Sequence, residues 1–394
     1  MFAVLTSVRK LPGLIAVVFS AFWLAACQPV SLSGTDTGGP SVRNNTPVPV
    51  ALLVPHGSSV PQEQKLARDL ENAARLAASD LSGVKIDLRV YGTAGNPAQA
   101  QTAAQNAVAD GAQIIIGPLH AESANAVAVA VANDGVNVMA FSNNPTIAGG
   151  NLFVLGQTFN DTANRLAGFA VRQGKSRVMT VYSDNLSGRL GKQAIEQALL
   201  QNGATPAGSV GYQFSQQGVV TAVPQIKTTA AQNGADAIFL TANTAGALPL
   251  FSQMLPEAGL SPDNIQYMGL SRWDTPPQTL ELPGVQGGWF TMPDPQRSAQ
   301  FRSRFQAAYG SAPHDLAGLA YDGVAAVGAL AQSGRPDALG RAALMQSAGF
   351  QGVNGVFRFG PDNTTDRGLA VATVRNNQVV VIDPAPQGFG GTGF

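Results

Sequence analysis

The sequence is poor in the residues that build metal centres and covalent cross-links. Of its 394 residues, one is cysteine and three are histidine. A single cysteine excludes an intramolecular disulfide. One cysteine with three histidines also leaves too few ligands for a usual structural zinc site. The sequence therefore predicts no metal centre.

Charged residues are scarce as well, and the two signs balance. The chain has 24 Lys+Arg and 24 Asp+Glu, which together make up 12% of it, against 45% hydrophobic residues. Without a basic excess the protein has no field to neutralise phosphates, so we expect no nucleic-acid partner. The apolar content excludes extensive disorder, and the length predicts two or three domains.

No apolar run is long enough to cross a membrane as a stable helix. The longest, Leu11 to Trp23, follows Arg9 and Lys10, which is typical of a secretory signal. It leads into Leu24-Ala-Ala-Cys27, which resembles a bacterial lipobox. That resemblance implies cleavage after residue 26 and lipidation of Cys27; the alternative is an ordinary secretory signal with a chance cysteine.

The residues next to Cys27 indicate the membrane in which the lipoprotein is expected to be anchored. Gln28 stands where aspartate would retain a Gram-negative lipoprotein in the inner membrane, so the resemblance implies a periplasm-facing, lipid-anchored protein of the outer membrane. Residues 27–47 are rich in Pro, Gly, Ser, Thr and Asn, which predicts a flexible tether. The Pro/Gly-rich residues 385–394 are expected to form a disordered tail.

From Val48 the pattern alternates between strand and helix. Val48 to Val54 is a buried-strand run, and the helix that follows from Pro61 to Leu81 has apolar residues at intervals of three and four. Ser59 and Gln62 have the spacing of a capping box. Further strands are expected at 84–90, 112–117, 136–141, 177–182, 207–212, 237–240, 265–269, 288–292, 356–359, 369–374 and 379–383, with helices between most of them. Short connections between strand and helix predict an α/β fold with two doubly wound, mostly parallel sheets.

Several motifs resemble type 1 periplasmic binding proteins of the Leu/Ile/Val-binding class. They are Ile114-Ile-Ile-Gly-Pro118, Val138-Met-Ala-Phe-Ser142, Ala320-Tyr-Asp-Gly-Val324 and the Phe350–Phe359 segment. The resemblance implies a two-lobed clamshell with three crossings between the lobes. We expect lobe 1 to comprise residues 48–157 and 273–348, and lobe 2 residues 158–272 and 349–384.

Within that class the chain is most similar to the penicillin-binding protein activator lipoproteins, through their C-terminal domain. The similarity rests on Gly117-Pro-Leu119, Met139–Asn143, Gln173-Gly-Lys175, Gly269-Leu-Ser-Arg272, Leu282–Gly287 and Met292-Pro293. It implies a non-catalytic lipoprotein that stimulates a bifunctional peptidoglycan synthase, a class A penicillin-binding protein. The alternative is the receptor of an ABC importer for branched-chain or other amino acids.

Candidate residues for a ligand or partner cleft follow the strands, because ligands of open α/β sheets bind at the carboxyl ends of strands. In the amino-acid-binding relatives, a hydroxyl and backbone N–H groups hold the carboxylate, and an acid from the second lobe holds the ammonium. Here Arg272 falls where that acid is expected, so a small anion is the alternative ligand; Asp184 and Asp274 are possible substitutes for the acid. The candidates are His56, Ser58, Ser142, Asn143, Tyr182, Asp184, Asn243, Arg272, Trp273 and Tyr321. For each, a structural role is the alternative.

No catalytic motif is found in the sequence. It has no Walker A, G-x-S-x-G, H-E-x-x-H or C-x-x-C pattern. Gly388 to Gly393 matches G-x-G-x-x-G, but it opens no helix because the sequence ends at Phe394, so we reject it as a nucleotide site. The prediction is a binding protein that is not an enzyme and has no cofactor.

Overall fold

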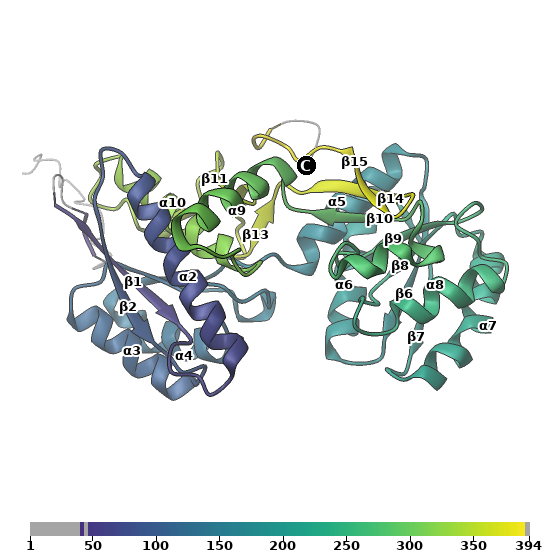
Figure 1. The fold of residues 1–394 in the computed structure, drawn as a ribbon, viewed down its shortest axis with the longest axis horizontal. Helices are drawn as coiled ribbons and strands as arrows, with labels where there is room; N and C mark the ends of the chain where they lie inside the picture. Colours follow the sequence, from purple (N-terminus) through teal and green to yellow (C-terminus); the bar gives the residue numbers. More distant parts are fainter. Residues whose placement is uncertain (1–39, 43–45, 391–394) are drawn as a thin grey trace, which may run out of the picture. The chain divides into compact units, whose positions relative to one another are not determined.

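The computed structural model describes residues 40–42 and 46–390, and a parallel five-stranded sheet forms its first half (Figure 1). The strand order is β2-β1-β3-β4-β5, and all pairs are parallel. Its strands and the helices between them are β1 (Val48–Val54), α2 (Pro61–Asp80), β2 (Ile86–Gly92), α3 (Pro97–Ala109), β3 (Ile114–Ile116), α4 (Ala121–Ala130), β4 (Asn137–Ala140) and β5 (Leu152–Val154), with 3₁₀ turns η1 (Ala132–Asp134) and η2 (Pro145–Ile147).

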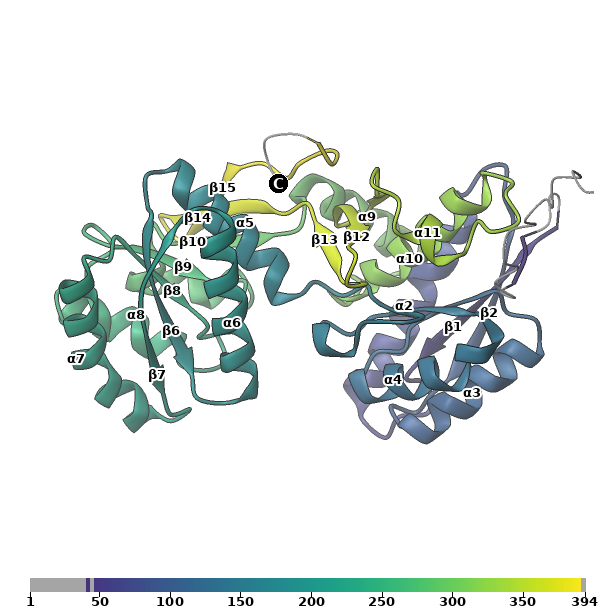
Figure 2. The same cartoon turned by 180° about the vertical axis from the view of Figure 1, so that it is seen from behind.

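Strand β1 shows why this sheet is covered on both faces. Leu52 and Val54 point into a core that includes α2, whereas Ala51 and Leu53 point into a core with α3 and α4. Successive strand side chains alternate between faces, so an unbroken apolar run fills both cores at once. Figure 2 shows α3 and α4 lying together beside these strands.

A seven-stranded sheet forms the second α/β unit. Its order is β15-β14-β10-β9-β8-β6-β7. Strand β14 pairs antiparallel with both β10 and β15, and the other pairs are parallel. Its elements are α5 (Phe159–Arg172), β6 (Arg177–Ser183), α6 (Leu186–Gln201), β7 (Thr205–Tyr212), α7 (Gln216–Asn233), β8 (Ala237–Leu240), α8 (Leu248–Glu257), β9 (Gln266–Gly269), η3 (Pro277–Glu281), η4 (Pro283–Val285), β10 (Trp289–Met292), β14 (Ala370–Arg375) and β15 (Gln378–Asp383).

A small antiparallel sheet, β11-β12-β13, completes the fold. It comprises β11 (Phe350–Gly352), β12 (Gly355–Phe359) and β13 (Thr365–Arg367), and follows α9 (Pro295–Tyr309), α10 (Ala317–Ala331) and α11 (Arg341–Leu344). Phe350, Phe357 and Phe359 pack into the same core as α2 and α10. The small sheet therefore belongs with the five-stranded sheet by packing.

The strand pairing differs from the expected lobe boundaries at two places. We expected residues 273–348 with lobe 1, but β10 pairs with β9 and β14 in the seven-stranded sheet. We expected residues 349–384 with lobe 2, but β11 and β12 pack into the core of the five-stranded sheet. The chain instead passes between the two units from β5 to α5, from β10 to α9 and from β13 to β14.

The ends of the described chain are also more ordered than the composition suggested. In the expected tether, Val42 is buried and its N–H donates to the Pro336 carbonyl at 3.0 Å. In the expected tail, Ala385 is buried and Gln387 forms side-chain hydrogen bonds. Cys27 and the signal peptide lie outside the described residues.

Candidate functional site

The first group of candidates lies where β1 ends, and helix α2 occupies their side chains. The Ser58 hydroxyl donates to Glu63 Oε2 at 2.6 Å and accepts from the Val60 N–H. His56 Nε2 lies 2.9 Å from Glu71 Oε2. Burial alone would raise the pKa of Glu71, but hydrogen bonds from His56 and an arginine lower it overall.

These contacts also correct the expected capping box. Helix α2 begins after Val60, and no side chain caps it. Ser58 instead bonds its own turn and the Glu63 carboxylate. The prediction that Ser59 caps this helix is therefore wrong. The serine that bonds the first turn of α2 is Ser58.

Ser142 and Asn143 follow β4, at the same edge of the sheet. Ser142 is buried, and its hydroxyl accepts the Asn144 N–H at 3.1 Å. Asn143 is exposed. This hydrogen bond of the Ser142 hydroxyl is thus within its own loop, and Ser142 is not among the residues that line the cavity described below.

The corresponding edge of the seven-stranded sheet carries Tyr182, Asp184 and Asn243. Asp184 pairs with Arg189 at 2.6 Å, and both are exposed. Tyr182 lies under the Lys192 ammonium, 5.4 Å from the ring centroid. Asn243 is exposed, and its carbonyl accepts the Leu248 N–H where α8 begins. The structure leaves all three at the surface of this edge.

A cavity of about 1040 Å³ lies between the elements around the β10–α9 connection. Of the ten candidates, Arg272 alone lines it. Its apolar wall includes Met292, Leu316 and Leu319. The polar and charged lining comprises Gln157, Arg272, Asp274, Thr275, Ser298, Arg302, Ser303, Gln306, His314, Asp315, Asn354 and Arg367.

Arg272 does not stand alone in this cavity. Its Nε and Nη2 donate to the two oxygens of Asp274 at 2.9 and 2.6 Å, in a bidentate fork. The hydrogen bond to Asp274 raises the pKa of Arg272, against the opposing effect of burial, and the charge of Asp315 adds to it. Of the three arginines in the lining, Arg272 is thus the one with two carboxylates, Asp274 and Asp315, acting on it.

Trp273, the residue between them, turns the other way. Its side chain is 0% exposed and packs against Phe290 in the core of the seven-stranded sheet. Two glycines make the slot: a Cβ on Gly269 or Gly288 would lie 2.3 Å from the indole. The prediction that Trp273 lines the cleft is wrong, because its indole is buried in this slot.

Tyr321 also has a structural role. Its hydroxyl donates to Asp80 Oδ2 at 2.6 Å and its ring packs on Phe301. Burial, with the neighbouring Asp80 carboxylate, raises the pKa of Tyr321 to about 12. The hydroxyl therefore stays protonated and joins α10 to α2.

One arginine of the cavity lining, Arg367, belongs to a buried ion pair that the sequence did not reveal. Arg367 Nη1 lies 3.1 Å from Asp322 Oδ2, and Arg367 Nη2 donates to the Leu155 carbonyl. The side chains are 4% and 0% exposed. Asp274, named above as a possible substitute for the acid, lines the cavity, whereas Asp184 does not; Asp315 and Arg367 were missed as site residues.

Two absences hold for the described residues. No group of three or more His, Cys, Asp or Glu in this part of the chain is arranged to hold a metal ion. None of the helices described there has the length and apolarity to span a bilayer.

Comparisons with known proteins agree with this architecture. Residues 47–378 match the family model described as periplasmic binding protein. A comparison with curated proteins finds no match. Among solved structures, a proposed branched-chain amino acid ABC transporter protein from Rhodospirillum rubrum is similar with a TM-score of 0.72 and 19% identity, covering 86% of this chain and 100% of that one.

Two further structures show the same fold. A branched-chain amino acid ABC transporter periplasmic ligand-binding protein from Burkholderia xenovorans has a TM-score of 0.67 and 18% identity, covering 87% of this chain and 97% of that one. An ABC transporter substrate-binding protein from Desulfitobacterium hafniense, in complex with Leu, has a TM-score of 0.62 and 20% identity, covering 86% and 100%. With a two-lobed α/β fold of type 1 and a family match over most of its length, the chain belongs to the periplasmic binding protein family.

Proposed function

We propose that this protein is the solute receptor of an ABC importer and that its ligand is a zwitterionic amino acid with an aliphatic side chain. The observation that carries the proposal is the Arg272–Asp274 fork in the cavity, with Asp315 beside it. A zwitterion transferred from water needs a partner for each of its charges. One guanidinium and two carboxylates provide both partners.

The donor count supports this arrangement. An arginine has five N–H donors, and two of those on Arg272 bond Asp274. The remaining donors suit a ligand carboxylate, while Asp274 and Asp315 suit its ammonium. Apolar side chains such as Leu316 and Met292 line the same cavity and suit an aliphatic side chain.

The pairing also removes the objection that an arginine would repel an ammonium. Asp274 neutralises Arg272, so the pair carries no net charge to repel a cation. The neighbouring proteins whose names state a branched-chain amino acid or Leu share the fold, and this supports the same ligand class. We propose no catalytic activity, in keeping with a family of binding proteins.

Calorimetric titration of the full-length chain tests this proposal. We expect leucine, isoleucine or valine to bind, and two leucine analogues not to: isoamylamine, which lacks the carboxylate, and 4-methylpentanoate, which lacks the ammonium. If 4-methylpentanoate binds as tightly as leucine, the ligand is an anion and the zwitterion proposal fails. If no amino acid binds, the receptor proposal fails.

A matched pair of variants locates the site. Arg272→Gln should weaken binding roughly 10- to 100-fold, the effect of losing a charge-assisted hydrogen bond. Arg335 forms the same fork with an aspartate two positions later, at 3.0 and 2.7 Å, but on the exposed surface. Arg335→Gln should therefore leave the affinity unchanged, and equal effects of the two variants would contradict the assignment.

A second candidate, activation of a class A penicillin-binding protein, has one structural observation in its favour. Leu186 and Phe214 are 70% and 62% exposed beside the ends of β6 and β7, as a protein-binding edge would be. Changing both to aspartate should abolish capture of a purified peptidoglycan synthase without affecting solute binding, whereas Leu200→Asp, also exposed, should not.

The proposed anchor at Cys27 has its own test. We propose that the mature protein is lipidated there and faces the periplasm from the outer membrane. Cells labelled with a palmitate analogue should incorporate label into the parent chain and none into Cys27→Ser. Label in the variant would contradict the assignment of the site.

A further inference from the structure

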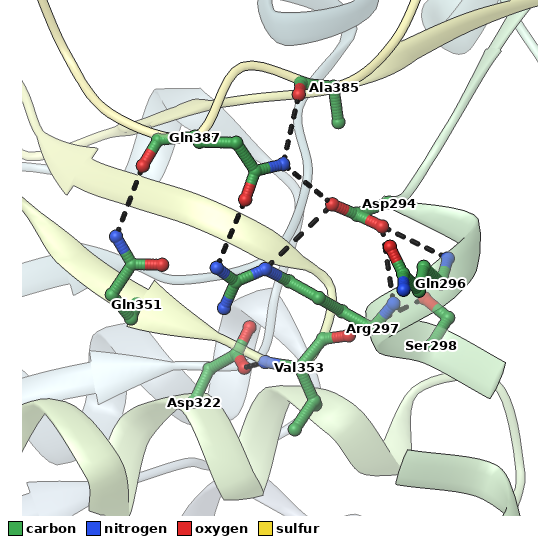
Figure 3. A network of polar contacts seen from close by, with 9 residues as sticks. All are labelled: Asp294, Gln296, Arg297, Ser298, Asp322, Gln351, Val353, Ala385 and Gln387. Carbon is green, nitrogen blue, oxygen red and sulfur yellow. Dashed lines mark hydrogen bonds and ion pairs between the residues drawn. The ribbon is translucent and has the colours of Figure 1, made fainter. Parts of the chain in front are cut away.

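The segment that follows the last strand of the seven-stranded sheet continues to the small three-stranded sheet. We call residues 384–390 the C-terminal strap. Gln387 is its centre (Figure 3). Its Nε2 donates to Asp294 Oδ2 at 3.1 Å, its Oε1 accepts from Arg297 Nη2 at 3.1 Å, and its main-chain carbonyl accepts from Gln351 Nε2 at 3.2 Å.

The strap is attached at both ends. At its start, Arg165 of α5 donates to the Pro384 carbonyl at 3.1 Å, and Ala385 is buried. At its far end, the Phe389 ring lies 4.3 Å from the guanidinium of Arg358 on β12. A Cβ on Gly349 would lie 2.6 Å from that ring, so the glycine permits the close approach.

These contacts make a fourth link between the two α/β units. The three chain crossings run from β5, β10 and β13. The strap adds non-covalent contacts from α5 and β15, in the seven-stranded unit, to α9, β11 and β12. Unlike a covalent crossing, such a link can open at the cost of a few hydrogen bonds and one ring contact.

The strap also reaches the wall of the cavity through Asp294. One oxygen of this carboxylate accepts from Gln387, while the other accepts the N–H groups of Gln296 and Arg297 and so caps α9. The same first turns of α9 line the cavity with Pro295, Ser298 and Arg302. The side chains of Asp294 and Arg297 therefore couple the position of the strap to the position of this cavity wall.

We propose that the C-terminal strap is a latch that fixes α9 relative to the seven-stranded sheet. The latch thereby sets the fraction of molecules that can bind the solute. Gln387 is a positioning residue that acts through Asp294. The latch itself does not depend on the identity of the solute; its effect on affinity rests on the proposed function. When the competent arrangement is a fraction of the population, the apparent Kd scales inversely with that fraction.

Distances between spin labels test the latch without any ligand. Gln105 on α3 and Gln225 on α7 are exposed and carry the labels as cysteines, in the full-length chain with Cys27→Ser. We expect deletion of residues 385–394 to shift or broaden the distance distribution. Deletion of residues 391–394 keeps the strap and should leave the distribution unchanged. Superimposable distributions for both deletions would refute the latch.

Point variants guard against a folding defect in the shortened chain. Gln387→Leu keeps about the size of the side chain and removes both the donor to Asp294 and the acceptor for Arg297, so it should act like the longer deletion. Gly388→Ala is the control, since a Cβ there meets nothing within 4 Å. A Gln387→Leu distribution identical to that of Gly388→Ala would likewise overturn the proposal.

Solute titrations then separate the latch from the proposed function. We expect the strap variants to change the apparent Kd for the solute roughly 3- to 10-fold and the controls not to change it. Changed distances with no solute binding in any variant would leave the latch standing and reject the receptor proposal. Changed distances with an unaltered Kd would refute the coupling of strap to cavity.

Discussion

Removing the charge of Arg367 should destabilise the protein strongly, because it leaves a carboxylate buried without its partner. Asp322 is 0% exposed, and its other oxygen accepts the Val353 N–H at 2.7 Å. Breaking a buried pair from one side typically costs about 3–5 kcal/mol. We expect Arg367→Met to lower the free energy of unfolding by that amount at pH 8, measured by urea unfolding followed by circular dichroism.

The pH dependence provides a second, independent test of this prediction. Burial raises the pKa of Asp322, and Arg367 opposes that rise. In Arg367→Met the opposing charge is gone, so the pKa of Asp322 rises further in the folded state only. The folded state then binds the proton more tightly than the unfolded state, and the deficit in unfolding free energy should shrink from pH 8 to pH 5.

Two further variants decide whether the unpaired charge is the cause. Arg367→Met/Asp322→Asn has no buried charge and should recover about 2 kcal/mol of the loss. Arg335→Met breaks an ion pair on the exposed surface and should cause no measurable change. A loss below about 1 kcal/mol for Arg367→Met, or no recovery with Asp322→Asn, would refute the reasoning.

Three other substitutions have defined outcomes. Trp273→Phe leaves part of the slot between Gly269 and Gly288 empty, so it should lower the free energy of unfolding by about 1–3 kcal/mol; an unchanged urea midpoint would contradict the packing of the indole in this slot. Tyr321→Phe should cost about 1 kcal/mol through the lost bond to Asp80, and an unchanged urea midpoint would contradict that contact. Burial raises the pKa of Asp161 from 3.8 to about 7, so the free energy of unfolding should fall as pH rises through that range. Asp161→Asn should flatten the profile, and a profile of unchanged slope would argue against Asp161 as its source.

The long elements of the fold could be predicted from the sequence because their patterns are local. Strand β1 is an unbroken apolar run, and α2 has an apolar stripe at helical spacing. Strands β5, β11 and β13 were missed, and each has three residues. A run of three residues is too short to show a periodicity, so only its pairing partners define it.

The place of a strand in a sheet is a long-range property, which is why β10 was expected in the wrong unit. Its four residues pair with β14, about eighty positions later in the chain. Neither strand contains a signal for its partner, because backbone hydrogen bonds are indifferent to the side chains that flank them. The position of the second crossing depends on this pairing: it lies at the β10–α9 connection and not at the expected boundary between residues 272 and 273.

The buried ion pair shows the same limit at a single residue. Asp322 stands beside Tyr321 in the motif Ala320-Tyr-Asp-Gly-Val324, and its neighbours in that motif do not show that its carboxylate is buried in an ion pair. Its partner Arg367 lies 45 positions away and reaches it only after β13 has paired in the small sheet. A buried charge cannot be told from an exposed one by sequence until the partner that compensates it is known.

Arg272 shows how much a site depends on the neighbour of its central residue. Taken alone, an arginine in place of an acid argues against an amino acid and for an anion. The bidentate contact with Asp274 reverses that argument, because the cationic donor and the anionic acceptor then stand side by side in one cavity. In the proposed function, the guanidinium and the carboxylate of this pair serve the two charges of a zwitterion. For this chain, a prediction of ligand class should therefore start from Arg272 and Asp274 together rather than from either one.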